Sequence, residues 1–260
     1  MLKKLIRTMF LAAAALFICT ACGEKSNAKT FTVGFDADFP PYGFKAPDGT
    51  YTGFDLELAA EVAKRNGWEL VLKPINWDAK DMELNTGSID CIWNGFTING
   101  REDKYEWTKP YVDNSQVVMV MKASTIVKLA DLAGKTVAVQ TDTPVKKALE
   151  AGGKQEALGK TFKQLKVTPN YNNAIMELES GGVDAVALDI GVAIDKLKSG
   201  KFAMLSEVVI TEKYGIGFAK GNKTLRDAVQ KTLLEMVADG TAGRISAKYF
   251  NGRDVLIIGK

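Results

Sequence analysis

Residues 31–44 read Phe-Thr-Val-Gly-Phe-Asp-Ala-Asp-Phe-Pro-Pro-Tyr-Gly-Phe, and the fold of the chain can be worked out from this stretch. Its first five residues, 31–35, form a short apolar run that predicts a buried β-strand. The loop after this strand contains Pro40 and Pro41, whose rings fix the φ angle and stiffen the backbone. A stiff loop at the end of a strand holds its side chains in defined positions. The stretch therefore predicts a binding loop that carries three aromatic residues, Phe39, Tyr42 and Phe44.

Beyond this loop, short apolar runs alternate with segments of helical periodicity, which predicts parallel strands joined by crossover helices. The expected strands are residues 31–35, 70–72, 89–93, 116–121, 136–139, 184–188 and 214–219. The expected helices are residues 55–66, 80–86, 144–151, 172–179, 191–197 and 224–238. This order predicts an α/β protein with two consecutive lobes. Ligands of open α/β sheets bind beyond the carboxyl ends of the strands, so we expect a cleft between the two lobes.

Two aromatic residues near the first strand have two possible roles. Phe39 lies in the stiff loop, and Phe54 stands at the start of the first expected helix, where Asp55 is expected to be the N-cap. Each ring can flank a ligand as part of a stacking clamp, or can pack in the hydrophobic core. The sequence alone leaves both roles open.

A second polar segment, residues 94–102, follows the strand expected at 89–93. Gly95 permits close approach of the backbone to a ligand, and Thr97 offers a hydroxyl group. Arg101 offers a planar guanidinium that suits a carboxylate through two parallel hydrogen bonds. Alternatively, Arg101 is a surface residue that pairs with Glu102 or with Asp103. The segment thus predicts an anion-binding loop, with a surface ion pair as the competing interpretation.

Composition excludes several function classes. The chain has 46% hydrophobic and 25% charged residues, as an ordinary globular protein does, and a net charge of +3 that is too small to indicate nucleic-acid binding. It contains no histidine, which removes the commonest general base and the commonest metal ligand. Cys91 lies in an expected strand and is interpreted as an inert core thiol. The absence of histidine argues against hydrolytic enzymes, and the leading expectation is a protein that is not an enzyme and holds no metal or cofactor.

The N-terminus has the pattern of an export signal. Three basic residues within the first seven precede the uncharged apolar run 9–18, which is too short to span a bilayer. Small residues then lead to Cys22, as in the lipobox of bacterial lipoproteins. We expect residues 1–21 to be a signal peptide, Cys22 to be acylated, and residues 22–30 to form a tether. Cys19 replaces the usual leucine of a lipobox, so cleavage with simple export is the alternative.

Taken together, the segments of residues 31–252 resemble the family 3 extracellular solute-binding proteins, the polar amino-acid receptors of ABC transporters. The resemblance rests on five motifs in order, and any one of them alone would be weak. They are Asp36–Tyr42, Gly53–Asp55, the segment from Gly95-Phe96-Thr97-Ile98 through Arg101 to Trp107–Tyr111, Gly134–Val139, and Asp184–Asp189.

The resemblance implies a role for each matching residue. Phe39 and Phe54 would flank the side chain of an amino acid, and Arg101 with Thr97 would bind its α-carboxylate. The α-ammonium group would be held by the carbonyl of Gly95, the hydroxyl of Thr97 and the carboxylate of Asp189. A zwitterion that leaves water needs a charged partner at each end, which agrees with this assignment. Two further residues complete the implied site, namely Asp36 for the ligand side chain and Thr143 as a donor from the second lobe.

The chain departs from the family pattern at two places. Arg101 is four residues after Thr97, one fewer than expected, which implies a tighter loop. Relatives usually have Gly-Thr-Thr or Gly-Ser-Ser in the second-lobe loop, where backbone N–H groups help bind the carboxylate. Here Asp142 replaces the glycine and Pro144 has no N–H to donate. Asp142 is expected either to repel a ligand carboxylate or to meet a cationic side chain.

The resemblance also implies a periplasmic-binding-protein-like fold of type II, in which two hinge strands join the lobes. We place the first lobe at residues 31–115 and 214–260, and the second at 116–213. The implied partners are a free amino acid, the permease of an ABC transporter, and a membrane through the lipid anchor alone. The implied location is outside the cytoplasmic membrane, in the periplasm or on a Gram-positive cell surface. The protein is expected to be a monomer.

Two alternative functions remain open at this point. One is an enzyme similar to the periplasmic cyclohexadienyl dehydratase, for which Asp36, Glu102 and Asp142 are the available proton donors or acceptors. The other is a sensory or adhesive lipoprotein that binds an amino acid without a transporter.

Overall fold

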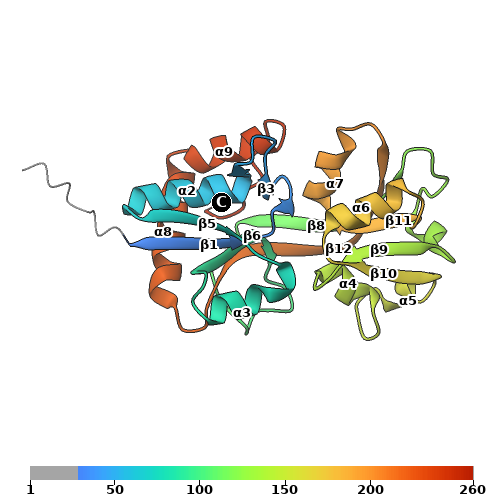
Figure 1. Cartoon of the computed structure of the whole chain (residues 1–260), viewed down its shortest axis with the longest axis horizontal. Helices are drawn as coiled ribbons and strands as arrows, with labels where there is room; N and C mark the ends of the chain where they lie inside the picture. The colour runs from blue at the N-terminus through green and yellow to red at the C-terminus, as the bar shows by residue number, and fades with distance from the viewer. Residues whose placement is uncertain (1–28, 260) are drawn as a thin grey trace, which may run out of the picture.

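The computed structural model describes residues 29–259, which form two α/β lobes arranged along the long axis of the molecule (Figure 1). The expected signal peptide, Cys22 and most of the expected tether lie outside the described residues. Within residues 29–259, no helix is long and apolar enough to cross a membrane.

The first lobe contains four strands of the main sheet, a small second sheet and four helices. The main strands are β1 (Thr30–Phe35), β5 (Glu69–Pro74), β6 (Cys91–Thr97) and β7 (Glu106–Trp107). The small sheet consists of β2 (Asp38–Phe39), β3 (Gly43–Lys45) and β4 (Tyr51–Thr52). The helices are α2 (Phe54–Asn66), α3 (Lys80–Asn85), α8 (Lys223–Ala238) and α9 (Thr241–Tyr249), and the short 3₁₀ helix η1 (Trp77–Ala79) precedes α3.

The second lobe contains three strands and four helices, with the 3₁₀ helix η2 (Leu129–Leu132) before the first strand. The strands are β9 (Thr136–Gln140), β10 (Gln164–Thr168) and β11 (Ala185–Asp189). The helices are α4 (Pro144–Leu149), α5 (Glu156–Gly159), α6 (Tyr171–Glu179) and α7 (Ile190–Leu197).

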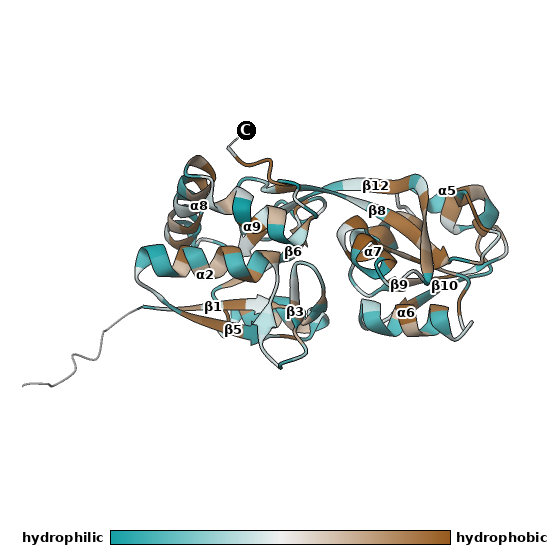
Figure 2. Cartoon of the chain, turned by 90° about the horizontal axis from the view of Figure 1, so that it is seen from above, coloured by the Kyte–Doolittle hydropathy of each residue, from teal (hydrophilic) through white to brown (hydrophobic). Residues whose placement is uncertain are grey.

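Two long strands, β8 (Val112–Met121) and β12 (Phe202–Phe218), run from one lobe to the other. Figure 2 shows both passing between the lobes. The strand order is β10-β9-β11-β8-β12-β6-β1-β5, with β7 beside β12. As predicted, β1 pairs in parallel with β5 and β6, and β9 with β10 and β11. The two long strands are antiparallel to each other and to their neighbours β6 and β11, a pairing that the expectation of parallel strands with crossover helices did not include.

The hydrophobic core follows from the apolar positions of the strands. Residues of β1, β6 and α2 pack together with residues of β8, β11 and α7, so the main core continues from one lobe into the other. A second cluster lies on the other side of the second-lobe sheet, among residues of β8, β9 and α4. Cys91 is fully buried, as predicted, and this burial raises the pKa of its thiol well above the usual value.

The first helix begins differently from the prediction. Gly53, with a φ of 140°, is the N-cap of α2, and a Cβ atom there would lie 2.3 Å from the carbonyl oxygen of Tyr42. Asp55 is therefore not the cap. Its buried carboxylate instead accepts hydrogen bonds from the N–H of Gly95 (2.6 Å) and the hydroxyl of Tyr111 (2.8 Å). Burial raises the pKa of Asp55 to about 7, although these hydrogen bonds oppose the shift. Asp55 thus joins α2 to β6 from inside the core.

Candidate ligand-binding site

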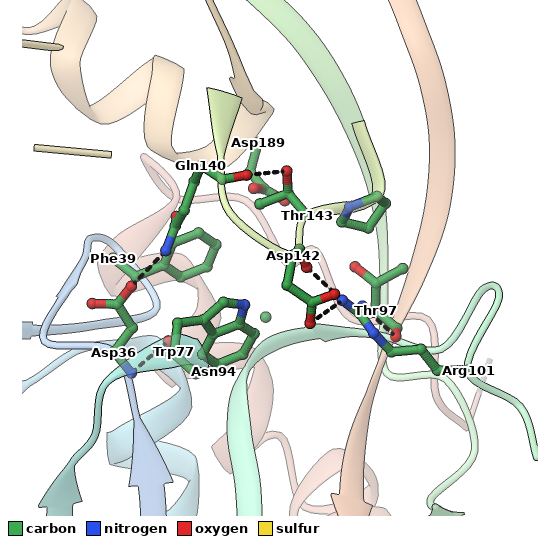
Figure 3. Close-up of a pocket in the computed structure, with 12 residues that line it drawn as sticks. Asp36, Phe39, Trp77, Asn94, Thr97, Arg101, Gln140, Asp142, Thr143 and Asp189 are labelled. Carbon is green, nitrogen blue, oxygen red and sulfur yellow. Dashed lines mark hydrogen bonds and ion pairs between the residues drawn. The ribbon is translucent and has the colours of Figure 1, made fainter. Parts of the chain in front are cut away.

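A pocket lies between the lobes, where the carboxyl ends of strands from both lobes face each other (Figure 3). It contains about 330 Å³ of space between atoms, part of it continuous with solvent. Seven of the eight residues proposed from the sequence line it, and Phe54 does not. The lining residues are Asp36, Phe39, Trp77, Asn94, Gly95, Thr97 and Arg101 from the first lobe, and Gln140, Asp142, Thr143, Pro144 and Asp189 from the second.

The aromatic part of the site differs from the prediction. Phe54 is 0% exposed and packs against Tyr111 and Phe250 in the core. Because these core rings enclose Phe54, its side chain does not line the pocket. Trp77 lines the pocket instead, together with Phe39. A signal for Trp77 was present, since it follows the strand expected at 70–72 just as Asp36 follows β1.

Arg101 is buried inside the cleft, at 5% exposure, so the interpretation as a surface ion pair is wrong. One terminal nitrogen donates to the carbonyl oxygen of Thr97 at 3.3 Å. The other donates to Asp142 of the second lobe, at 2.6 Å to its carbonyl oxygen and 3.2 Å to its carboxylate. Its guanidinium also lies 5.1 Å from the centre of the Phe96 ring. The tight loop after β6 therefore aims Arg101 across the cleft.

Asp142 meets two cationic side chains. Besides Arg101, the ammonium of Lys80 at the start of α3 forms an ion pair with the Asp142 carboxylate. Burial alone would raise the pKa of Asp142, but the charges of Arg101 and Lys80 outweigh it, so its pKa is lowered and the group is a carboxylate at neutral pH. The expectation that Asp142 meets a cationic side chain of the ligand stays a prediction, and within the protein its carboxylate pairs with Arg101 and Lys80. Lys80 itself was missed, because its helix gave no indication of which residue faces the cleft.

Thr143 is the N-cap of α4, followed by Pro144 in the first turn. Its hydroxyl donates to the carbonyl oxygen of Gln140 at 2.8 Å and accepts from the N–H of Lys146 at 3.4 Å. The preceding residue, Asp142, has a φ of 46°, in the left-handed region that glycine adopts most readily. The loop thus keeps the backbone form of a glycine turn while it carries a carboxylate.

Asp189, at the end of β11, belongs to a buried network on the two connecting strands. Its carboxylate accepts hydrogen bonds from the amides of Asn114 (2.6 Å) and Gln116 (2.7 Å), and from the hydroxyls of Tyr171 (2.7 Å) and Tyr214. The same two amides also donate to Glu212, at 2.6 Å each. Burial raises the pKa of Asp189, and burial together with the nearby charge of Asp189 raises the pKa of Glu212 to about 8. The network adjoins the pocket through Asp189.

Asp36 lies at the opposite part of the pocket from Arg101, with Trp77 and Phe39 between them in the view of Figure 3. Its carboxylate accepts from the Gln140 amide at 3.0 Å and from the N–H of Asp38 at 2.8 Å. Burial raises the pKa of Asp36, and these hydrogen bonds oppose the shift. The pocket therefore combines a buried guanidinium, separate carboxylates and two aromatic rings.

Two lobes joined by a pair of strands, with a charged cleft between them, define a solute-binding protein. Residues 31–252 match the bacterial extracellular solute-binding proteins, family 3, and the chain belongs to this family. The L-cystine-binding protein TcyJ of Escherichia coli K12 is 33% identical over 231 residues, which cover 87% of this chain and 84% of the relative.

Solved structures agree with this assignment. A substrate-binding protein of an ABC uptake transporter from Streptococcus pneumoniae, with bound histidine, aligns with a TM-score of 0.83 and 31% identity, over 88% of this chain and 94% of that one. The ancestral amino-acid-binding protein AncCDT-1, a precursor of cyclohexadienyl dehydratase, aligns with a TM-score of 0.77 and 31% identity, over 85% and 95%. The two-lobed α/β fold expected from the sequence is confirmed.

Proposed function

We propose that this protein captures a free amino acid outside the cytoplasmic membrane and delivers it to an ABC importer. The observation that carries the proposal is the placement of buried Arg101 and Asp189 in one pocket between the lobes. An amino-acid zwitterion has one charged group for each of them. The names of relatives and of similar structures, which bind cystine, histidine and arginine, support the same ligand class.

The roles proposed within the pocket are those implied by the family resemblance, and the pocket lining supports them. Arg101, assisted by the Thr97 hydroxyl and by the backbone of Thr143, binds the α-carboxylate. Asp189 and the Gly95 carbonyl bind the α-ammonium group. The rings of Phe39 and Trp77 flank the side chain of the ligand. Asp36 makes a polar contact with that side chain, which favours a polar amino acid.

A thermal-shift screen tests the ligand class. The protein lacking residues 1–29, unfolded and refolded to remove any bound amino acid, is screened with the twenty amino acids, ornithine, cystine and several cyclohexadienyl acids. Ligand at 100 times its dissociation constant adds about 2.7 kcal/mol to the free energy of unfolding. A shift with one or a few amino acids supports the proposal, whereas a folded protein that shifts with none contradicts it.

Calorimetry on Arg101→Ala tests the assignment of the carboxylate. Removing one partner of a buried charge pair costs about 2–5 kcal/mol of binding free energy. The control is Arg244→Ala, because Arg244 lies on α9, far along the chain from the pocket and outside its lining. Unchanged affinity of Arg101→Ala would remove Arg101 from the site.

An enzymatic function is not favoured. The related cystine- and arginine-binding proteins are named for binding, and AncCDT-1 is itself named an amino-acid-binding protein. Asp142 is held as a carboxylate by two cations, and Glu102 is exposed and outside the pocket lining. Neither is a suitable proton donor at neutral pH, and the third candidate, Asp36, accepts hydrogen bonds from Gln140 and Asp38 and is assigned to the ligand side chain.

We also propose that Cys22 carries a lipid anchor and that the hinge lies where β8 and β12 cross between the lobes. The proposed lobes are residues 31–115 with 214–260, and 116–213, in a monomeric protein. Cys22→Ala in the full chain should move the protein from the membrane fraction to the soluble fraction after cell lysis. Retention of the variant in the membrane fraction contradicts acylation at Cys22.

A further inference from the structure

The ion pairs of Asp142 pose a problem for ligand binding. If Asp142 faced Arg101 alone, its carboxylate would neutralise the guanidinium that the proposed function assigns to the ligand. An incoming α-carboxylate would then meet a neutral pair and would be repelled by Asp142 itself. Charges in a buried site interact strongly, so this arrangement would bind a carboxylate poorly.

Lys80 changes the charge of this cluster. Its side chain is 3% exposed, and its ammonium group hydrogen-bonds to the carbonyl oxygen of Trp77 at 3.2 Å and pairs with the carboxylate of Asp142. Lys80, Arg101 and Asp142 together carry a net charge of +1. That charge matches one ligand carboxylate.

The surroundings of Lys80 leave it dependent on Asp142. Among the described residues, Asp142 is the one carboxylate in an ion pair with Lys80. Asp81, its neighbour in the chain, is engaged by the hydroxyl of Tyr105. The ammonium also lies 5.1 Å from the centre of the Trp77 ring, on the first-lobe wall of the pocket. A buried ammonium without a carboxylate partner is costly, so Lys80 depends on Asp142.

We infer that Lys80 determines affinity in this site by neutralising Asp142, so that the positive charge of Arg101 remains available to the carboxylate of the ligand. This inference rests on the proposed function. It assigns a role to a residue outside the motifs that identify the family. It also explains how a chain with a carboxylate at the glycine position of the second-lobe loop retains an anion site.

Two substitutions and their combination test the inference by calorimetry with the amino acid found in the screen. Lys80→Met keeps the length of the side chain and removes its charge, while Asp142→Asn keeps a residue that tolerates a positive φ. Lys80→Met should bind at least tenfold more weakly, and Asp142→Asn a few-fold more tightly. The double variant restores the net charge of +1 and should bind within about threefold of the unsubstituted protein, because both charges of the pair are gone.

The control is Lys64→Met, which removes an exposed positive charge from the same lobe and should leave the affinity unchanged. Two results overturn the inference. One is a Lys80→Met variant that binds as tightly as the unsubstituted protein. The other is a double variant that binds as weakly as Lys80→Met, which would mean that Lys80 acts through a direct contact or through folding.

A measurement without ligand separates this inference from the proposed function. If the unsubstituted protein binds no amino acid, the proposed function fails. The urea midpoints of the unsubstituted protein, the two single variants and the double variant then test the coupling of Lys80 with Asp142, on which the inference depends. If Lys80 and Asp142 are paired, the shift of the urea midpoint in the double variant differs from the sum of the shifts in the two single variants. The double variant is then no less stable than Lys80→Met. Additive shifts would show that the two residues are not coupled and would overturn the inference.

Discussion

The side-chain amide of Gln140 donates a 3.0 Å hydrogen bond to the carboxylate of Asp36, and this bond joins the two lobes at the pocket. Asp36 follows β1 of the first lobe, whereas Gln140 is the last residue of β9 in the second. Both side chains are buried. Because the bond spans the cleft, it stabilises the arrangement in which the lobes are close together.

Asp36→Ala is expected to weaken ligand binding. The substitution removes the acceptor of the buried Gln140 amide, and a buried donor without a partner costs about 1–3 kcal/mol. Titration calorimetry with the identified amino acid measures the loss. Asp48→Ala is the matched control, since Asp48 is exposed and, among residues 29–259, its carboxylate accepts hydrogen bonds from Thr50 of the same turn. Equal affinities for the two variants would contradict a role for Asp36 in the closed cleft.

Trp77→Ala and Phe54→Ala should affect different properties of the protein, ligand affinity in the first case and stability in the second. Trp77 is half-buried and lines the pocket, so its loss should weaken binding by about 1–2 kcal/mol while stability changes less. Phe54 lies in the core, where truncation of a phenylalanine costs about 3–5 kcal/mol of the free energy of unfolding. Urea denaturation and calorimetry on each variant separate the two effects. A Phe54→Ala protein of normal stability and reduced affinity would restore the original sequence prediction.

The Asp189–Glu212 pair should make stability depend on pH. The folded-state pKa of Glu212 is about 8, above its ordinary value of 4.5, because of burial and the charge of Asp189. The folded protein therefore holds a proton that the unfolded chain releases. The resulting stabilisation is complete below about pH 4.5 and is lost as the pH rises to about 8, by an amount on the order of a few kcal/mol.

Glu212→Gln should remove this loss, because the amide has no proton to release. Urea denaturation of both proteins between pH 4 and pH 9 gives the two curves of stability against pH. The unsubstituted protein should fall more steeply between pH 5 and pH 8. Parallel curves would mean that Glu212 does not hold the proton.

Asp38→Ala is expected to loosen the cleft without touching the pocket lining. Its carboxylate accepts from the amides of Asn170 (3.0 Å) and Asn172 (2.7 Å) at the start of α6 in the second lobe. A hydrogen bond to a charged group contributes about 1.5–3 kcal/mol. Because water can replace part of this contribution in the variant, loss of the two bonds should reduce ligand affinity only a few-fold. Small-angle X-ray scattering of the liganded protein should show a larger radius of gyration. An unchanged radius and affinity would show that these bonds do not hold the lobes together.

The amino-acid sequence by itself determined the elements and their order. Apolar runs and helical periodicity are local properties, so β1, β9 and α8 could be placed within a few residues. Because ligands of open α/β sheets bind beyond the carboxyl ends of the strands, the loops after residues 31–35 and 89–93 could be placed at a site. The resemblance to the family implied the seven residues that line the pocket, from Asp36 to Asp189.

Only the tertiary structure decided which side chains meet across the cleft. Phe54 and Trp77 are both aromatic residues at the start of helical segments, yet the packing of α2 buries one and the end of β5 exposes the other to the pocket. Lys80 and Asp142 lie 62 residues apart in the chain and pair through the approach of the two lobes. Periodicity reports which face of one element is apolar. Periodicity carries no information about which charged residue of the other lobe will lie across the cleft from that element.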